Sequence, residues 1–262
     1  MRGPGSGRES GVCHRFTLLN GEEADRVVDW LRAVRRALAA GMAADGVAPP
    51  SFARPGAVPF EAIDCYPGAE SSVIVAEGSA ATAQATQAAQ AMAPVAPAPM
   101  ASPGELARID LVWGIEVPWQ KGLVFNARIE SALSGSGMWR TAMEDARCIV
   151  PVRAFYETRN VEAPSGRRPQ YRFSVRGSEA LLLAGLRIGD RFALVTCDPD
   201  AVVGAVHTRM PLALTASEAL AWLDGRPDAA VLLQRHLPVP LIAEEEPDPA
   251  RRPANPDQMS LF

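Results

Sequence analysis

Residues 170–197, QYRFSVRGSEALLLAGLRIGDRFALVTC, contain three apolar segments that short turns separate. The segments 170–176, 181–186 and 191–197 each have the length of a strand, and the turn RIGDR joins the last two. Earlier in the chain, we predict further strands at 72–76, 109–113, 123–127 and 147–157. Many short strands joined by tight turns, without a regular alternation of strand and helix, favour a largely antiparallel sheet.

Two segments have the periodicity of amphipathic helices. Between residues 25 and 40, apolar side chains recur every three or four positions and arginines take the opposite face. The segment 216–224 follows Thr215, a good N-cap, and Glu218 completes a capping box. We therefore predict an α+β fold: a single compact domain with a largely antiparallel β core and flanking helices.

Composition divides the chain into segments. Residues 1–11, MRGPGSGRESG, read as a disordered leader, and residues 12–238 read as the folded domain. Within that domain, residues 79–104 contain no charged residue and are rich in Ala, Gln and Pro. This composition indicates a low-complexity insertion. Residues 239–262 are rich in proline and charge, so we predict a flexible tail.

Overall composition excludes several classes of protein. The 262 residues carry a formal net charge of −4, and of 26 basic residues only Lys121 is a lysine. No run of about 18 apolar residues could span a membrane, and the leader lacks the apolar core of a secretory signal. The cysteines are far apart and have no CxxC pair, so we expect a reduced cytoplasmic protein without a structural metal or cofactor.

Three segments carry polar residues that are candidates for chemistry. Asn126 and Glu130 would share one face of a strand with Arg128, although a half-solvated strand explains the same pattern. Glu157 ends an apolar run, where burial would raise its pKa, although a surface position at a strand end is the alternative. His207 interrupts another apolar stretch, as a catalytic or a structural histidine.

Eight short motifs, in order along the chain, resemble the SRAP family of abasic-site processing proteins, named for SOS-response-associated peptidases. The motifs are C-x-R-F-T at 13–17, W-G at 113–114, P-W at 118–119, N-A-R-x-E at 126–130, R-C-I-V-P at 147–151, F-Y-E at 155–157, A-G-L at 184–186 and H-x-R-M-P at 207–211. The resemblance covers residues 13 to about 223, interrupted at 79–104. It implies a compact α+β domain with a groove for single-stranded DNA.

The resemblance also implies a chemistry for Cys13. In the family, removal of the initiator Met exposes a cysteine whose α-amine condenses with the aldehyde of a ring-opened abasic sugar. The thiol then closes a thiazolidine, which leaves a DNA–protein crosslink. By motif position, Cys13 is the nucleophile and Asn126 holds the sugar or the N-terminal residue. Glu157 and His207 would move protons.

Further residues are implied as DNA contacts. Arg15, Arg128 and Arg209 match positions suited to phosphates, Trp119 suits base stacking, and Pro67 matches a loop near the site. The expected partner is single-stranded DNA with abasic sites. An α-amine also suits imine formation better than lysine, because at pH 7 roughly one α-amine in seven is neutral and far fewer lysines are.

Cys13 departs from the family pattern because twelve residues precede it. An internal cysteine has no free amine, so the full chain should form no thiazolidine. Val12 offers an explanation, since the valine codon GTG also initiates translation in bacteria and is then read as methionine. The alternatives are proteolytic exposure of Cys13 and a paralogue that binds single-stranded DNA without crosslinking. A thiol peptidase that uses Cys13 is a further alternative.

The last five residues, QMSLF, resemble the pentapeptide that binds the bacterial sliding clamp. Gln258, Leu261 and Phe262 would make the contact, and the proline-rich tail would supply reach. A terminus that ends in these residues by chance is the alternative. With single-stranded DNA as the partner, these features predict a nucleoid-associated protein.

Overall fold

Five strands close into a barrel: β3 (Glu70–Ala76), β4 (Leu106–Trp113), β11 (Arg191–Cys197), β10 (Leu181–Ile188) and β8 (Arg147–Thr158) pair in that order, and β8 returns to β3. This computed structural model describes residues 13–52, 63–77, 104–134, 137–160, 168–225, 229–234 and 236–247. Within these residues, only the pairings of β11 with β4 and with β7 (Asn126–Arg128) are parallel.

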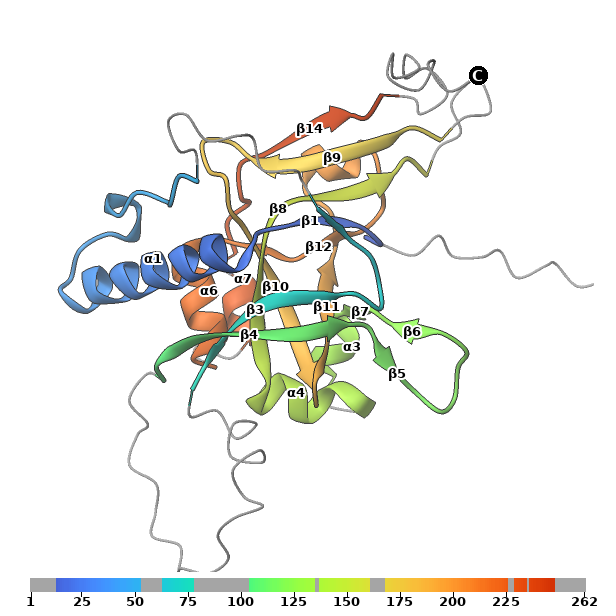
Figure 1. Ribbon diagram of the computed structural model, residues 1–262, viewed down its shortest axis with the longest axis horizontal. Helices are drawn as coiled ribbons and strands as arrows, with labels where there is room; N and C mark the ends of the chain where they lie inside the picture. Colours follow the sequence, from blue (N-terminus) through green and yellow to red (C-terminus); the bar gives the residue numbers. More distant parts are fainter. Residues whose placement is uncertain are drawn as a thin grey trace, which may run out of the picture.

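The other strands extend this barrel or line its ends (Figure 1). They are β1 (Phe16–Leu18), β2 (Asp64–Cys65), β5 (Ile115–Glu116), β6 (Leu123–Val124), β9 (Gln170–Val175), β12 (Met210–Pro211), β13 (Ala213–Leu214) and β14 (Leu241–Glu245). The helices are α1 (Gly21–Ala39), α3 (Ile129–Leu133), α4 (Arg140–Asp145), α5 (Ala201–Gly204), α6 (Ala216–Leu223) and α7 (Ala229–Gln234), with 3-10 turns η1 (Ala44–Gly46) and η2 (Gly137–Trp139).

Alternate residues of the barrel strands enter two different hydrophobic cores. In β10, Leu181 and Leu183 point into the barrel interior with Phe192, whereas Leu182 points outward to the helices. Strands buried on both faces read as continuous apolar runs, which is why LLLAGL shows no alternation. Figure 1 shows α1, α6 and α7 against one side of the barrel, with α3 and α4 at one end.

The structure confirms the predicted α+β class and most of the predicted elements. The strands expected at 72–76, 109–113, 147–157, 170–176, 181–186 and 191–197 are present as β3, β4, β8, β9, β10 and β11. The capping box of α6 is formed, with Thr215 Oγ1 accepting from the Glu218 N–H. The first helix begins at Gly21 rather than residue 25, because Asn20 caps it and forms a capping box with Glu23.

Three expectations differ from the structure. The segment 123–127 is not one strand: β6 ends at Val124, and β7 begins at Asn126 to pair with β11. The chain then turns into α3, so Glu130 lies in a helix and does not share a strand face with Asn126. Residues 241–245, expected in the flexible tail, form β14 instead, because Leu241 is buried and the strand pairs with β9. The leader 1–11, residues 79–103 of the insertion, and residues 248–262 lie outside the described residues.

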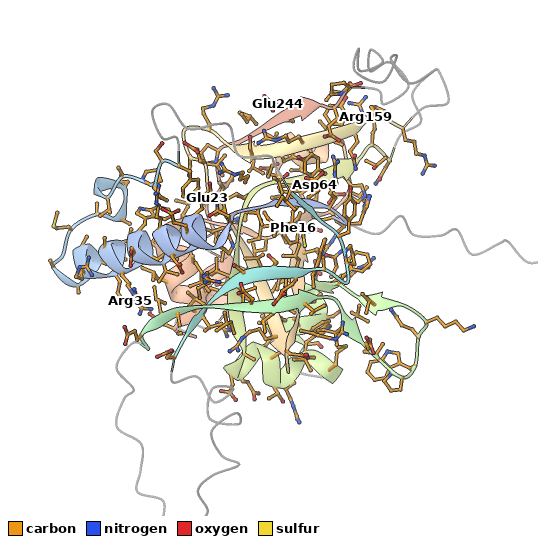
Figure 2. The ribbon with its side chains drawn as sticks, in the orientation of Figure 1. Phe16, Glu23, Arg35, Asp64, Arg159 and Glu244 are labelled. Carbon is orange, nitrogen blue, oxygen red and sulfur yellow. The ribbon has the colours of Figure 1, made fainter. Side chains whose placement is uncertain are left out.

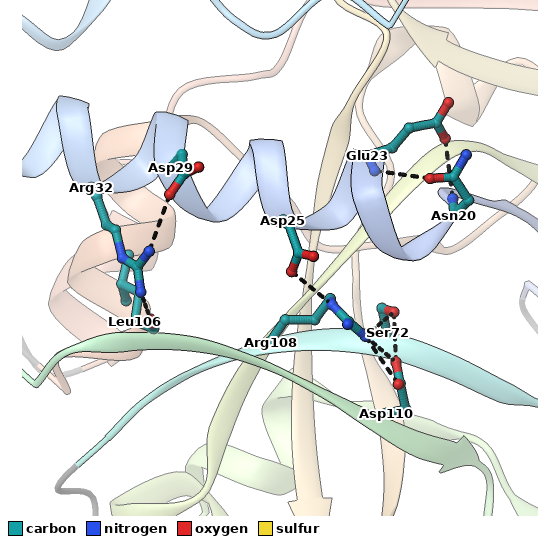
Figure 3. Close-up of polar contacts among 9 residues, drawn as sticks. All are labelled: Asn20, Glu23, Asp25, Asp29, Arg32, Ser72, Leu106, Arg108 and Asp110. Carbon is teal, nitrogen blue, oxygen red and sulfur yellow. Dashed lines mark hydrogen bonds and ion pairs between the residues drawn. The ribbon is translucent and has the colours of Figure 1, made fainter.

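Polar contacts join α1 to β4 (Figure 3). Arg108 of β4 donates to Asp25 of α1 at 2.8 Å and to Asp110 at 2.9 Å. Arg32 donates to the Leu106 carbonyl at 2.7 Å. In the described part of the chain, no helix is long and apolar enough to cross a membrane.

Gly185 allows β10 to pack tightly against its neighbours. A Cβ at this position would lie 2.8 Å from Cys148 Sγ and 3.3 Å from a methyl group of Val150. We therefore expect Gly185→Ala to lower the free energy of unfolding by about 1–3 kcal/mol, through overpacking of the barrel interior. Gly46→Ala is the matched control, since nothing lies within 4 Å of its Cβ position. Thermal or urea unfolding measures the stability of both variants. An equal loss of stability in Gly185→Ala and Gly46→Ala would refute the close-packing explanation.

Candidate active site

Strand pairing brings Cys13 to Glu157. Strand β1 pairs antiparallel with β8, with Phe16 opposite Phe155, so the residues that flank this pair lie side by side. The backbone N–H of Cys13 donates to Glu157 Oε1 at 2.8 Å. Cys13 is fully buried and Glu157 is 1% exposed. The backbone of Cys13 is left-handed, with φ 33°.

Asn126 and His207 complete this group from other elements. Asn126 is held by β7 against β11, and its Nδ2 lies 3.5 Å from the Cys13 carbonyl oxygen. His207 follows α5, and its backbone N–H donates to the Val203 carbonyl at 2.8 Å. Its Nδ1 lies 3.9 Å from Glu157 Oε2. Cys13, Asn126, Glu157 and His207 are far apart in the sequence and form one group in the structure. Asn126 and Glu157 contact the Cys13 backbone, and His207 lies next to Glu157.

Burial controls the protonation of these groups. It raises the pKa of Glu157 well above its usual range, and the hydrogen bond from Cys13 only partly opposes this. Burial, reinforced by the charge of Glu157, also raises the pKa of the Cys13 thiol. The pKa of His207 is lowered, mainly by burial. The site thus favours a protonated carboxyl, a neutral thiol and a neutral imidazole.

Two arginines beside the site are bound by carboxylates. Arg209 makes a bidentate pair with Glu130, at 2.7 and 2.9 Å, and its backbone lies against His207 Nδ1. Arg15 pairs with Asp64 at 3.0 Å and with Glu246. These ion pairs hold both arginines next to the site and compensate their charges.

An exposed hairpin stands beside the loop that follows β2. Strands β5 and β6 pair, and Trp119 in the connection is 68% exposed. Gly114 has a φ of +104°, and a Cβ there would lie 2.9 Å from the Leu123 side chain, so glycine permits this hairpin geometry. Next to Pro67, the Gly68 N–H donates to the Trp113 carbonyl at 2.7 Å. The exposed indole ring offers a flat apolar face and an N–H donor, the combination that makes tryptophan common at interfaces.

Comparison with known proteins identifies the family. A family model described as SOS response associated peptidase (SRAP) matches residues 62–245, which include Asn126, Glu157 and His207. The chain belongs to the SRAP family. The resemblance seen in the sequence motifs is thereby confirmed.

Individual SRAP relatives agree with this assignment. Over 130 residues the chain is 30% identical to the abasic site processing protein YoqW of Bacillus subtilis, covering 44% of this chain and 57% of that protein. Over 138 residues it is 26% identical to abasic site processing protein YoaM of the same organism, covering 47% of this chain and 60% of that protein. The chain thus spans about three-fifths of the length of these relatives.

Solved structures show the same fold. A phage-related protein of Bordetella bronchiseptica aligns with a TM-score of 0.55 at 21% identity, over 90% of this chain and 95% of that one. A second Bordetella bronchiseptica protein aligns with a TM-score of 0.53, also at 21% identity, over 90% of this chain and 100% of that one.

The SRAP fold gathers the residues predicted from the motifs into two groups. Cys13, Glu157 and His207 are buried and lie together with the half-buried Asn126, and Arg209 adjoins this group through the backbone contact with His207. Outside this group, Trp119 and Arg128 are exposed, and Pro67 is half-buried. Gln258, Leu261 and Phe262 lie outside the described residues.

Sequence reasoning missed the carboxylates that bind the predicted DNA-contacting arginines. Asp64 and Glu246 are 49 and 231 residues from Arg15 along the chain. Asp198 contacts Arg209 at 2.9 Å and was also missed. No local sequence pattern predicts such long-range pairs, because acidic residues are common on the surface near strand ends and their sequence context does not identify a partner.

Proposed function

We propose that this SRAP protein recognises abasic sites in single-stranded DNA and, when Cys13 is the first residue, traps them as a thiazolidine crosslink. The observation that carries the proposal is the 2.8 Å contact between the Cys13 nitrogen and Glu157 Oε1, in a fully buried setting. The names of YoqW and YoaM, both abasic site processing proteins, support the choice of substrate.

Each group has a role in the proposed reaction. The neutral α-amine of Cys13 adds to the aldehyde carbon of the opened sugar and forms a carbinolamine. Protonated Glu157 gives its proton to the departing hydroxyl so that water leaves, and the proton on the nitrogen then passes to the Glu157 carboxylate as the imine forms. Sγ of Cys13 then adds to the imine carbon, while the thiol proton passes to the nitrogen. One water is lost in total, and no oxidant or cofactor is required.

His207 and Asn126 would position these partners. A neutral imidazole 3.9 Å from Glu157 Oε2 can accept or return a proton during ring opening of the sugar. The Asn126 amide near the Cys13 carbonyl fixes the direction of the nucleophile. In this proposal Arg15, Arg128 and Arg209 contact phosphates, and Trp119 stacks on a base.

The test compares single-stranded oligonucleotides with and without one abasic site. A chain that starts at Cys13 should bind both, and only the abasic oligonucleotide should remain attached in a denaturing gel. Failure to bind either oligonucleotide would refute the DNA-binding proposal, and binding without attachment would refute the crosslinking step.

Non-covalent binding is the second candidate function. A chain in which residues precede Cys13 would have this function, because its Cys13 nitrogen is an amide and cannot form an imine. A thiol peptidase is less well supported, because burial and Glu157 raise the pKa of the Cys13 thiol, whereas a cysteine that attacks a peptide carbonyl needs a lowered pKa.

Trp119 gives a direct test of base stacking. Replacing an exposed aromatic ring that stacks on a base costs about 1–3 kcal/mol, so Trp119→Ala should weaken binding of undamaged single-stranded DNA roughly 5- to 150-fold. Fluorescence anisotropy measures this loss. Leu237→Ala is the control, since Leu237 is equally exposed and lies after α7. Equal affinity of the Trp119→Ala and parent chains would exclude the stacking role.

The C-terminal QMSLF sequence is proposed to bind the bacterial sliding clamp. An aromatic and an aliphatic side chain at the end of a tether can enter an apolar pocket. The double variant Leu261→Ala/Phe262→Ala should therefore weaken clamp binding at least ~10-fold, as measured by surface plasmon resonance, while leaving DNA binding unchanged. An unchanged clamp affinity would reject the motif.

A further inference from the structure

One face of the paired strands β8 and β9 leads from the barrel interior to the candidate active site. On this face Phe155 and Phe173 are buried and stack, with ring centres 5.0 Å apart. The next residues on the same face are Glu157 and Tyr171, which lie directly opposite each other in the register. Facing residues have Cβ atoms about 5 Å apart, so Tyr171 lies beside Glu157.

Arg159 is the next residue of the chain on this face. It lies two residues beyond Glu157, and its guanidinium carbon is 5.2 Å from the centre of the Tyr171 ring. Figure 2 shows Arg159 at the end of the sheet where β8 stops and β9 begins. The following residue, Asn160, donates from its backbone to the Val206 carbonyl at 3.1 Å, which holds Arg159 close to the segment that carries His207.

Arg159 differs from two other arginines near the site in its charge balance. Arg15 and Arg209 each pair with two carboxylates. Within the described residues, Arg159 makes no ion pair, and its buried Nε has no hydrogen-bond partner. Glu245, which lies opposite Tyr171 on β14, accepts instead from the Tyr171 hydroxyl at 2.9 Å. The positive charge of Arg159 is therefore available to a ligand.

The arrangement has the chemistry of a phosphate site. An arginine that stacks on a ring keeps its in-plane N–H groups for a phosphate, which it can bind through two parallel hydrogen bonds. In the proposed reaction the abasic sugar is held at Cys13 and Glu157, and a phosphate flanks it on each side. Residues two apart on a strand are about 7 Å apart, so Arg159 lies within reach of one of these phosphates.

We propose that Arg159, supported by the Tyr171 ring, binds a phosphate that flanks the abasic sugar and thereby positions the strand at Glu157. This inference rests on the proposed function and adds a residue that none of the sequence motifs contains. Arg159 can bind this phosphate without breaking an ion pair to a described residue, whereas Arg15 and Arg209 would first have to leave their carboxylates.

The first test measures the affinity of the full chain for an undamaged, fluorescently labelled oligo-dT strand over a range of salt concentrations. Arg159→Gln should weaken binding about 5-fold at low salt. It should also reduce the slope of log affinity against log salt concentration by about 0.7, the change expected for one lost phosphate contact on a single strand.

Arg176→Gln is the matched control, because Arg176 is exposed and follows β9 at the end away from Tyr171. It removes the same charge and should change the affinity less than about 2-fold and the slope by less than about 0.2. An unchanged slope in Arg159→Gln, or equal losses in both variants, would overturn the inference.

Arg159→Lys separates a phosphate contact from a structural role of the side chain. Lysine keeps the charge but lacks the flat guanidinium that stacks and binds in a bidentate manner. It should therefore retain the salt slope of the parent while binding about 3-fold more weakly. A slope as low as that of Arg159→Gln would overturn the inference. If the parent chain itself does not bind the strand, the proposed function fails, so the two failures are distinguishable.

Discussion

A chain that begins at Cys13 will gain the mass of an abasic oligonucleotide less one water, and its Cys13→Ala variant will gain none. Only an N-terminal cysteine offers an amine and a thiol that can close a five-membered ring on one carbon. Alanine keeps the amine, so it stops at an imine that hydrolyses and does not survive denaturation. Intact-mass spectrometry after mixing with abasic single-stranded DNA measures the difference, which we expect to exceed about 100-fold in yield.

Two control variants identify the reacting groups. Cys197→Ala removes a half-buried thiol whose pKa is raised to about 12 by burial, and it should crosslink like the parent. Lys121→Arg removes the one lysine amine and should also leave the yield unchanged. Loss of the adduct in the lysine variant, or its persistence in Cys13→Ala, would contradict the assignment. The 262-residue chain, with an amide at Cys13, should bind without an adduct.

Glu157→Gln should slow crosslinking by about 10²- to 10⁴-fold, the usual contribution of a positioned general acid. Glutamine keeps an oxygen that can accept from the Cys13 N–H, so the nucleophile stays in place. It cannot give a proton to the departing hydroxyl. Single-turnover kinetics on a quenched gel measures the rate, and anisotropy shows whether binding of undamaged DNA is retained. A rate within a factor of about three of the parent would remove Glu157 from the mechanism.

We also expect the difference in stability between Glu157→Gln and the parent chain to depend on pH. Burial raises the pKa of Glu157, so folding favours its protonated form. The contribution of Glu157 to the free energy of unfolding is fully present below about pH 4.3, its pKa in the unfolded chain. This contribution is lost as the pH rises through its pKa in the folded chain. Glu157→Gln should therefore match the parent near pH ~4 and exceed its Tm near pH ~8. A lower Tm of the variant at the higher pH would contradict the desolvation argument.

The sequence predicted the elements of the fold well, because these depend on local patterns. Runs such as LLLAGL and the Thr215–Glu218 capping box carry their structure within a few residues. Closure of the barrel was not predictable in this way. It depends on the pairing of β8 with β3 and of β11 with β4, which joins segments that are distant in the sequence.

The candidate site was predicted by the resemblance of its motifs rather than by physical pattern. For Glu157, the apolar run before it correctly indicated burial. The contact with Cys13 spans 144 residues of sequence, and no periodicity encodes it. The carboxylate partners of Arg15 were missed for the same reason. In the proposed function, Arg15 would therefore have to exchange a carboxylate for a phosphate.

The left-handed backbone at Cys13 has a consequence for maturation. A non-glycine residue with φ 33° costs about 1–3 kcal/mol, and the cost arises from the peptide carbonyl that precedes Cys13. A chain that starts at Cys13 has no such carbonyl and no φ angle at this residue. Under the proposed function, the terminus that carries the reactive amine would therefore also be the one without this backbone strain, and starting the chain at Cys13 would favour the fold instead of opposing it.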